Sequence, residues 1–467
     1  MPAHSSDTNG DSDTGGDVFM RRRSALATRL GAQPALIAAG GARARNYAAN
    51  TYPFRASSHF LYLFGVSTER DGFGLWDGTS WTLYLPARTA DDALWEGPRP
   101  SFEDLAAATA CTVRPLADVE REIARHAAVA TLPAADLETC AMQSRLLGRD
   151  VRRGVFAAID EALADAMIAL RLRHDAGAQA ELRLAAEATA AAHRAGMRAT
   201  RAGARESFVR AAMEAEIIAR DLTVAYGSIV TTHGEVLHNE QHHRVLGKDD
   251  MILADVGAES PGGWAGDVTR TWPVAGRFSP AQRDLYEVVL DAQLRAIAAV
   301  RPGVRYRDIH ILAGQSLADG LVGVGLLQGD PAELYADGVI ASFFPHGIGH
   351  LLGLDVHDME DLGDRAGYAP GRQRNPAPGI RYLRLDRDLE PGMALTIEPG
   401  VYFIPAILDD PSLDGRVVRA RIDDFVSAGA RGIRIEDDVL VTAAGHEVLT
   451  AAIPKSINAL EQVMSNA

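Results

Sequence analysis

Four acidic residues lie in or beside apolar, strand-like segments of this chain, and they constrain its fold more than any other feature. Asp255, Asp267, Glu398 and Glu436 fall in the segments MILADVGAE (251–259), GDVTRTWPV (266–274), ALTIEPGVYFI (394–404) and GIRIEDDVLVT (432–442). Their β-branched and aromatic neighbours favour strands. An unpaired carboxylate among apolar residues carries a heavy desolvation cost. The fold must therefore supply these carboxylates with partners.

Each segment taken alone also has an ordinary structural interpretation. Asp255 and Asp267 can end a strand or cap a turn. Period-two alternation in GIRIEDDVLVT puts two isoleucines on one face and Arg434, Glu436 and Asp438 on the other, so an edge strand with a solvated charged face is an equal alternative. The turn-forming run SPGGW joins the first two segments and predicts a β-hairpin, which brings Asp255 and Asp267 onto neighbouring strands.

The four acidic residues are more informative as a set. Bare carboxylates at close range raise each other's pKa or repel, so cations must neutralise them in a shared site. Ligation dominated by carboxylates suits Mn²⁺, with Zn²⁺ or Co²⁺ as alternatives, and does not suit a thiolate site. Two ions about 3.5 to 4 Å apart activate water and polarise the carbonyl that it attacks. The set therefore predicts a hydrolase with two divalent metal ions.

The segment PHGIGHLLGLDVHDM (345–359) contains three histidines. It is not an HExxH zinc motif, because Gly347 follows His346 and no Glu stands between His346 and His350. A single histidine is usually a hydrogen-bonded core or loop residue, but three in one glycine-punctuated segment indicate a site. We expect at least one of them to be a metal ligand.

Composition excludes several classes of protein. The formal net charge of -15 leaves no electrostatic footprint for nucleic acid. No uninterrupted apolar run reaches the roughly 18 residues of a transmembrane helix, and the polar, acidic start has no signal-peptide pattern. Only Cys111 and Cys140 occur, away from every motif, so neither a disulfide framework nor a cysteine metal site is expected. A cytoplasmic protein fits these features.

A chain of 467 residues is long enough for two domains. We expect a disordered tail over residues 1–17 and a small α/β domain over 18–173, which contains the strand-like pieces FLYLFGV (60–66) and WTLYLPA (81–87). The catalytic domain, 174–467, opens with a long helix over 176–201. A second helix spans 279–303, with Ser279 as N-cap and Pro280 at its first position. Strands and helices in blocks predict an α+β architecture.

Five motifs of the chain carry a resemblance to a known family. LADVGAE, GDVTRTW, HGIGHLLGLDVHD, TIEPG and GIRIEDD resemble, in the same order, the ligand-bearing motifs of the pita-bread metallopeptidases. The similarity is closest to the branch that cuts Xaa-Pro bonds, which contains aminopeptidase P and prolidase. It covers most of residues 176–467, and YPFRASSHFLYLFGV (52–66) resembles the N-terminal domain of that branch. The implied fold is a C-terminal pita-bread domain preceded by a smaller, creatinase-like α/β domain.

The resemblance implies a dinuclear centre held by Asp255, Asp267, His350, Glu398 and Glu436. Asp267 and Glu436 would bridge the two ions. Glu398 would accept a proton from the attacking water and pass it to the departing proline nitrogen.

Further residues near this centre take roles by the same resemblance. His346 and His357 would flank the substrate, and His357 would stabilise the oxyanion. His238, in EVLHNE, would contact the substrate, and Arg434 would hold the carboxylates. The stretch before His238 departs from the family pattern, with Asn239 where Tyr is common. This departure concerns the shape of the pocket for the amino end of the substrate.

Within the branch, two long segments resemble the insertions of prolidase, a dipeptidase: RYLRLDRDLEPG (381–392) and VYFIPAILDD (401–410). Arg384 falls where prolidase grips the free carboxylate of its dipeptide, although a surface arginine is the plainer interpretation. The favoured function is therefore hydrolysis of Xaa-Pro dipeptides. The alternative is an Xaa-Pro aminopeptidase that accepts longer peptides with proline in second position. A creatinase-like or binding-only protein is disfavoured by the intact ligand set. Family members are commonly homodimers or larger oligomers.

Overall fold

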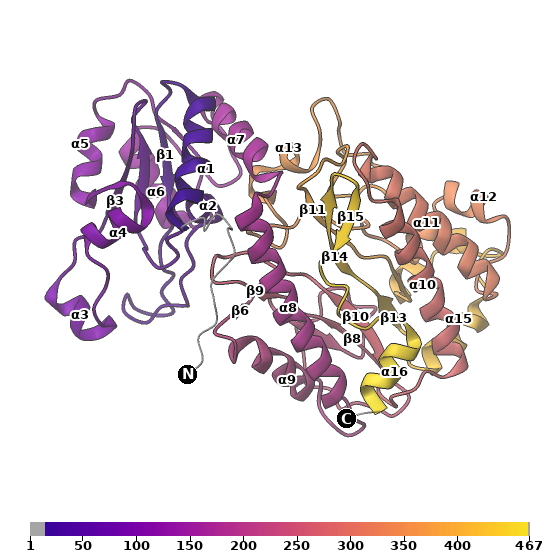
Figure 1. Cartoon of the computed structure of the whole chain (residues 1–467). Coiled ribbons are helices and arrows are strands. Elements are labelled where there is room, and N and C mark those ends of the chain that lie inside the picture. Colours follow the sequence, from indigo (N-terminus) through magenta and orange to yellow (C-terminus); the bar gives the residue numbers. More distant parts are fainter. Residues whose placement is uncertain (1–14, 466–467) are drawn as a thin grey trace, which may run out of the picture. The chain divides into compact units, whose positions relative to one another are not determined.

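The structure, a computed structural model, describes residues 15–465 of the chain. The chain divides into two compact units, one up to Leu170 and the other from Arg171 (Figure 1). Most of the predicted tail, residues 1–17, lies outside the described residues. Its last three residues begin the first helix instead, where Asp17 in the first turn complements the helix dipole, so that part of the prediction is wrong.

The first unit is an α/β domain around a five-stranded sheet. Its strands run in the order β4-β3-β2-β1-β5, and parallel pairs lie at both edges. Its elements are α1 (Gly15–Leu30), β1 (Ala35–Ala38), α2 (Ser58–Phe64), β2 (Phe73–Trp76), β3 (Trp81–Leu85), α3 (Ala90–Glu96), α4 (Phe102–Thr109), β4 (Thr112–Pro115), η1 (Leu116–Asp118), α5 (Val119–Ile123), β5 (Ala130–Thr131), α6 (Leu137–Leu147) and α7 (Ala158–Arg171).

One predicted strand of this unit is correct and the other is wrong. WTLYLPA forms β3, whereas FLYLFGV forms most of α2. Ser57 caps α2 by accepting a hydrogen bond from the backbone of Phe60, and Gly65 ends it in the left-handed conformation at φ 68°. Every residue of α2 is buried. An apolar run of this length without polar alternation fits a buried helix as well as a strand, which explains the error.

The second unit carries all the predicted site residues. Its elements are α8 (Ala176–Ala199), α9 (Glu206–Ile218), β6 (Thr223–Val224), β7 (Ile229–Thr231), β8 (Met251–Asp255), β9 (Ala258–Glu259), β10 (Thr269–Pro273), α10 (Pro280–Ala299), α11 (Tyr306–Gly323), α12 (Pro331–Ala336), η2 (Val339–Ser342), η3 (Glu360–Leu362), α13 (Asp364–Gly367), β11 (Ala394–Ile397), β12 (Gly400–Tyr402), α14 (Pro405–Leu408), η4 (Pro411–Leu413), α15 (Arg419–Ser427), β13 (Gly432–Arg434), β14 (Asp437–Thr442), β15 (Gly445–Val448) and α16 (Ile457–Ser465).

Helices enclose the strands of this unit. The two long helices predicted from the sequence are present as α8 and α10, and α10 begins with a capping box between Ser279 and Gln282, with Pro280 at its start. Helix α8 packs against α9, and α10 packs against α11. In Figure 1 the first pair lies on one side of the central strands and the second pair on the other. None of the described helices is long and apolar enough to span a membrane.

The predicted pairing of the first two acidic segments is confirmed. Strand β8 runs antiparallel to β10 with Asp255 opposite Thr269, and β7 pairs with the other edge of β8. The short strand β9 lies in the connection between them. Asp267 precedes β10 by two residues, so the hairpin brings it close to the end of β8 that carries Asp255.

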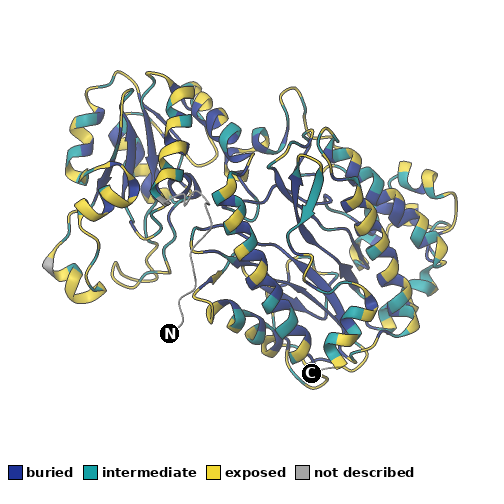
Figure 2. Cartoon of the chain, in the orientation of Figure 1, coloured by how far each residue is buried: buried dark blue, intermediate teal, exposed yellow. Residues whose placement is uncertain are grey.

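The other two acidic segments are interrupted where their glutamates stand. Glu398 follows β11 rather than lying inside a strand, and Glu436 stands between β13 and β14. Both faces of GIRIEDDVLVT are buried, since Ile433, Arg434 and Asp438 are at most 4% exposed. The alternative of a solvated edge strand is therefore wrong. Figure 2 shows most strands of this unit as buried and β15 as intermediate, whereas the helices around them expose their outer faces.

Candidate metal centre

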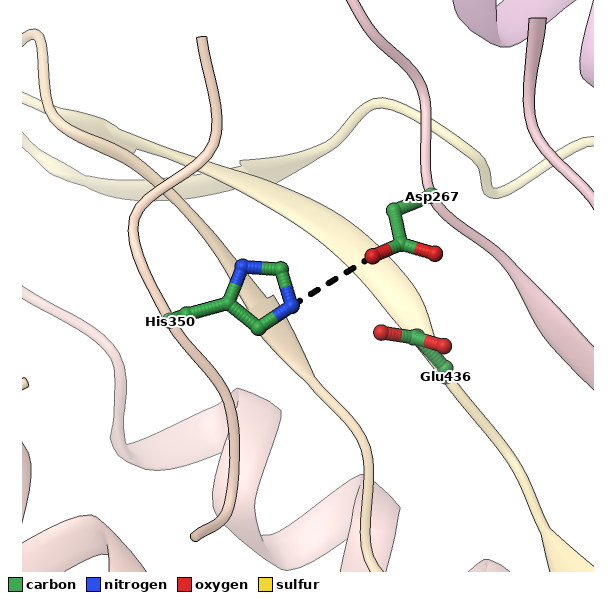
Figure 3. A group of neighbouring side chains, drawn as sticks. All are labelled: Asp267, His350 and Glu436. Atoms are coloured by element: carbon green, nitrogen blue, oxygen red, sulfur yellow. Dashed lines mark ion pairs between the residues drawn. The ribbon is translucent and has the colours of Figure 1, made fainter. Parts of the chain in front are cut away.

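Three predicted ligands from separate segments of the chain converge. One ligand atom each from Asp267, His350 and Glu436 lies within 4.8 Å of the others, and all three side chains are buried (Figure 3). Glu398 joins them, with its Oε1 3.7 Å from Nε2 of His350. Tyr226 ties the remaining ligand, Asp255, to Asp267, as described below. The five predicted ligands line one cavity of about 130 Å³.

Backbone pairing holds these side chains in place. The amide of His350 donates to Oγ1 of Thr396 in β11, and the amide of Thr396 donates to the carbonyl oxygen of His350. The amide of Glu436 donates to the carbonyl oxygen of Thr269 in β10 at 3.0 Å, which fixes the break after β13 beside Asp267. Hydrogen bonds to neighbouring strands thus fix the backbone at His350 and Glu436.

The tautomer of His350 leaves one nitrogen for a cation. Nδ1 lies 3.0 Å from the carbonyl oxygen of Leu351, which accepts only a hydrogen bond, so Nδ1 carries a proton. In neutral imidazole Nε2 then has a free lone pair, and it points at Oδ2 of Asp267, 3.3 Å away (Figure 3). Two acceptor atoms facing each other need a cation between them. Burial lowers the pKa of His350, but the hydrogen bond and charge of Asp267 outweigh it and raise that pKa to about 9, so a proton fills this role when no metal does.

The carboxylates also indicate a missing positive charge. Burial, together with the charges of Asp267 and Asp255, raises the pKa of Glu398 to about 7. Burial and the neighbouring carboxylates raise the pKa of Glu436 well above its ordinary value. A divalent cation would relieve this repulsion, and four carboxylates with one imidazole are the oxygen-rich donor set that hard divalent ions bind. The residues present therefore fit the predicted metal centre.

Tyr226 joins two of the predicted ligands and was not itself predicted. Its hydroxyl lies 2.5 Å from Oδ1 of Asp255 and 2.7 Å from Oδ1 of Asp267. Burial and the charges of both carboxylates raise the pKa of Tyr226 well above its ordinary value, so the hydroxyl keeps its proton as a donor. Nothing in the sequence around Tyr226 signals this role, because the contact depends on the tertiary fold.

A second group of hydrogen bonds connects Arg434 to the site. Arg434 donates from Nη2 to Asp255 at 2.6 Å, from Nε to Oγ1 of Thr269 at 2.8 Å, and from Nη1 to Tyr402 at 3.2 Å. Oγ1 of Thr269 in turn donates to Glu436 at 2.7 Å. Thr269 stands inside the motif GDVTRTW, and Tyr402 stands in the segment ALTIEPGVYFI, so their closeness in sequence to the predicted ligands signals a place near the site.

The three predicted non-ligand histidines line the same cavity. Nδ1 of His346 donates to the carbonyl oxygen of Gly347, and its Nε2 lies 2.8 Å from the hydroxyl of Tyr402. The ring of His357 packs edge-on against that of His350, with centroids 4.2 Å apart. His238 reaches the cavity from the loop after β7.

Arg384 also lines this cavity and pairs with a carboxylate at its rim. Its Nη1 lies 2.7 and 2.9 Å from the two oxygens of Glu360, and both side chains are more than a third exposed. Neither Nε nor Nη2 of Arg384 has a hydrogen-bond partner among residues 15–465. These two donors form one edge of the guanidinium, which remains open to a second carboxylate.

Comparison with known proteins decides the family. The model of metallopeptidase family M24 matches residues 180–443, and that of the aminopeptidase P N-terminal domain matches residues 19–132. The chain belongs to metallopeptidase family M24. Its two-domain architecture, with an N-terminal aminopeptidase P-type domain and a C-terminal pita-bread domain, is therefore confirmed.

Several M24 proteins are similar over nearly the whole chain. A probable Xaa-Pro aminopeptidase of Uncinocarpus reesii is 32% identical over 431 residues, which cover 88% of this chain and 86% of that protein. The Xaa-Pro dipeptidase of Homo sapiens is 32% identical over 476 residues, which cover 96% of this chain and 93% of that protein. The solved structure of Pseudomonas aeruginosa aminopeptidase PepP superposes with a TM-score of 0.80 at 29% identity, over 96% of this chain and 97% of that one.

Proposed function

We propose that this M24 metallopeptidase hydrolyses the Xaa-Pro bond of small peptides at a centre of two divalent metal ions. The observation that carries the proposal is the buried convergence of Asp267, His350 and Glu436, with Asp255 and Glu398 in the same cavity. The naming of its relatives as Xaa-Pro aminopeptidases and an Xaa-Pro dipeptidase supports the substrate class. When bound, the ions supply charge neutralisation, polarisation of the scissile carbonyl and a lowered pKa for water.

The roles of the protein groups follow from their positions. Glu398 is the proposed proton carrier: this carboxylate lines the cavity beside the other proposed ligands, where it can take a proton from water and give one to the departing proline nitrogen. His357 faces the cavity beside His350 and is placed to donate to the oxyanion. The proton on Nδ1 of His346 is held by Gly347, so its Nε2 is an acceptor for the hydroxyl of Tyr402.

Dipeptides are the favoured substrates because of Arg384. The open edge of its guanidinium, at the cavity that holds the proposed ligands, suits the free carboxylate of a proline at the carboxyl end. The alternative, an aminopeptidase that accepts residues beyond proline, is supported by the relatives that carry that name and by the likeness to aminopeptidase PepP. The same centre serves either reaction, and only the end of the cavity near Arg384 distinguishes them.

We also propose Mn²⁺ as the native ion, a homo-oligomer such as a dimer, and a cytoplasmic location. The oxygen-dominated donor set supports manganese over softer metals. Two buried, unpaired cysteines, Cys111 and Cys140, are consistent with a reducing compartment.

A substrate panel tests the proposal. Protein loaded with Mn²⁺ is assayed with alanyl-proline, alanyl-prolyl-alanine and, as a control, alanyl-alanine. Cleavage of alanyl-proline in preference to the tripeptide supports the dipeptidase, and the reverse preference supports the aminopeptidase. Cleavage of neither proline peptide by protein with bound metal would contradict the proposal.

A further inference from the structure

Residues 232–244, here called the His238 loop, connect β7 to the turn before β8 and carry His238 into the metal-ligand cavity. No helix and no strand of the sheets occurs within the loop. Irregular backbone needs other hydrogen-bond partners to hold one conformation. The contacts that hold this loop in one conformation therefore determine the position of His238.

Glu206, the first residue of α9, is fully buried and binds both ends of the His238 loop. At one end its Oε1 accepts hydrogen bonds from the amide of Thr232 at 2.8 Å and from the Thr232 hydroxyl at 3.0 Å. At the other end its Oε2 accepts from the amide of Arg244 at 3.3 Å, and the amide of Glu206 donates to the carbonyl oxygen of Arg244 at 3.0 Å. One side chain thus closes the loop at its base.

A short series of hydrogen bonds extends from Glu206 to the neighbour of His238. Oε1 of Glu206 accepts a longer hydrogen bond, 3.4 Å, from the hydroxyl of Thr231. That hydroxyl accepts from the side-chain amide of Asn239 at 3.0 Å, and Asn239 is buried. The hydrogen bonds therefore run from Glu206 through Thr231 to the residue that follows His238.

The loop also contacts β13, the strand that carries Arg434, at Gly234. A Cβ added to Gly234 would come within 2.6 Å of the carbonyl oxygen of Gly432 in β13, and a Cβ added to Gly432 would come within 2.3 Å of the backbone of Gly234. Neither position therefore has room for a side chain. The loop is held at its base by Glu206 and packs against β13 at Gly234.

We propose that Glu206 is a positioning residue for substrate binding: acting through Thr231 and Asn239, it holds the His238 loop so that His238 stands in the substrate cavity. The proposal rests on the proposed Xaa-Pro peptidase function for the reaction that reports it. Among residues 15–465, Glu206 makes no hydrogen bond or ion pair with any of the five proposed ligands. Its loss should therefore change substrate affinity and leave metal binding unchanged.

Glu206→Gln is the informative substitution. Glutamine keeps the size of the side chain but replaces one acceptor by an NH₂ group, which must face the N–H of either Thr232 or Arg244. We expect KM for alanyl-proline to rise roughly tenfold, in line with the loss of a buried hydrogen bond to a charged group. We expect kcat and the metal content to remain close to those of the wild type, because the lost interaction acts on binding.

A double-mutant cycle separates positioning from a general loss of stability. In a His238→Ala background, Glu206→Gln should change KM by less than about twofold, because the residue that it positions is absent. Val209→Ala is the matched control: Val209 is fully buried in the same helix, so its truncation should lower stability without changing KM. An unchanged KM in Glu206→Gln, or an equal rise in the two backgrounds, would overturn the proposal.

Two further measurements keep the test decisive. If Glu206→Gln does not fold, Asn239→Ala should produce the same rise in KM, and an unchanged KM there contradicts the proposal. Amide hydrogen exchange of residues 233–241 needs no activity: it should accelerate in Glu206→Gln and not in Val209→Ala. Failure of the wild type to cleave any Xaa-Pro peptide refutes the proposed function alone, whereas unchanged exchange refutes the role of Glu206.

Discussion

The Nη2 atom of Arg434 donates a hydrogen bond to Oδ2 of Asp255 at 2.6 Å, and both side chains are buried. Arg434 carries a fixed positive charge that neutralises Asp255, a proposed ligand. Burial and the neighbouring carboxylates nevertheless keep the pKa values of Glu398 and Glu436 raised, so these two groups require further positive charge. The balance of charge therefore depends on both the arginine and the bound ions.

Arg434→Met should lower the free energy of unfolding of the metal-free protein by about 3 kcal/mol, because it leaves a buried carboxylate without its partner. Added Mn²⁺ should recover part of this loss by neutralising Asp255. Arg295→Met is the control, since Arg295 pairs with Asp291 on an exposed helix face and should contribute less than about 1 kcal/mol. Urea denaturation with and without metal measures both effects, and equal losses in the two variants would contradict the assignment.

Glu436→Ala should abolish hydrolysis and lower metal occupancy, because the proposed bridging ligand is lost. Activity should fall by at least about 100-fold. Elemental analysis of the purified variant, alongside its activity, provides the measurement. A variant that retains full activity with two bound ions would show that Glu436 is not a ligand.

Arg384→Met should raise KM for alanyl-proline by about tenfold or more, the amount expected for a lost charged hydrogen bond. KM for alanyl-prolinamide, which has no free carboxylate, should change little. An equal rise in KM for the two substrates would indicate that Arg384 supports the fold and does not bind the substrate carboxylate.

His310 makes stability depend on pH away from the metal centre. Its Nε2 donates to the carbonyl oxygen of Gly379 at 2.7 Å, and burial lowers its pKa from 6.5 to about 4. Between these values the unfolded chain binds the proton and the folded protein does not, so stability is full above pH 6.5 and falls as the pH drops towards 4. The shift corresponds to about 3 kcal/mol.

His310→Gln checks this pH dependence. Glutamine can still donate to Gly379 but does not titrate, so the variant should lose less stability than the wild type between pH 7 and 5 in urea denaturation. An identical loss of stability in the two proteins would show that another group governs the fall in stability at low pH.

The sequence predicted which acidic residues come together better than it predicted the local structure around them. Carboxylates in apolar segments have few explanations, so Asp255, Asp267, Glu398 and Glu436 were identified without a fold, and all four line one cavity. The positions at which the strands end could not be predicted. The strands stop at Glu398 and Glu436 because the backbone amides of these residues bond to other segments.

Contacts between segments far apart in sequence explain the rest of the shortfall. Two residues lie outside every acidic motif: Tyr226, which joins two predicted ligands, and Glu206, at the base of the His238 loop. Their roles arise from tertiary packing. The helix α2 was misread because a short, wholly buried apolar run has the same composition in a helix and in a strand.

The most direct test of a dinuclear centre is a metal titration of chelator-treated protein, with the bound ions counted by elemental analysis and hydrolysis of alanyl-proline followed in the same samples. We predict negligible activity without metal, two Mn²⁺ ions per chain at saturation, and activity that rises with their binding. Hydrolysis that survives complete removal of metal would contradict the account. So would a titration in which the protein binds no Mn²⁺.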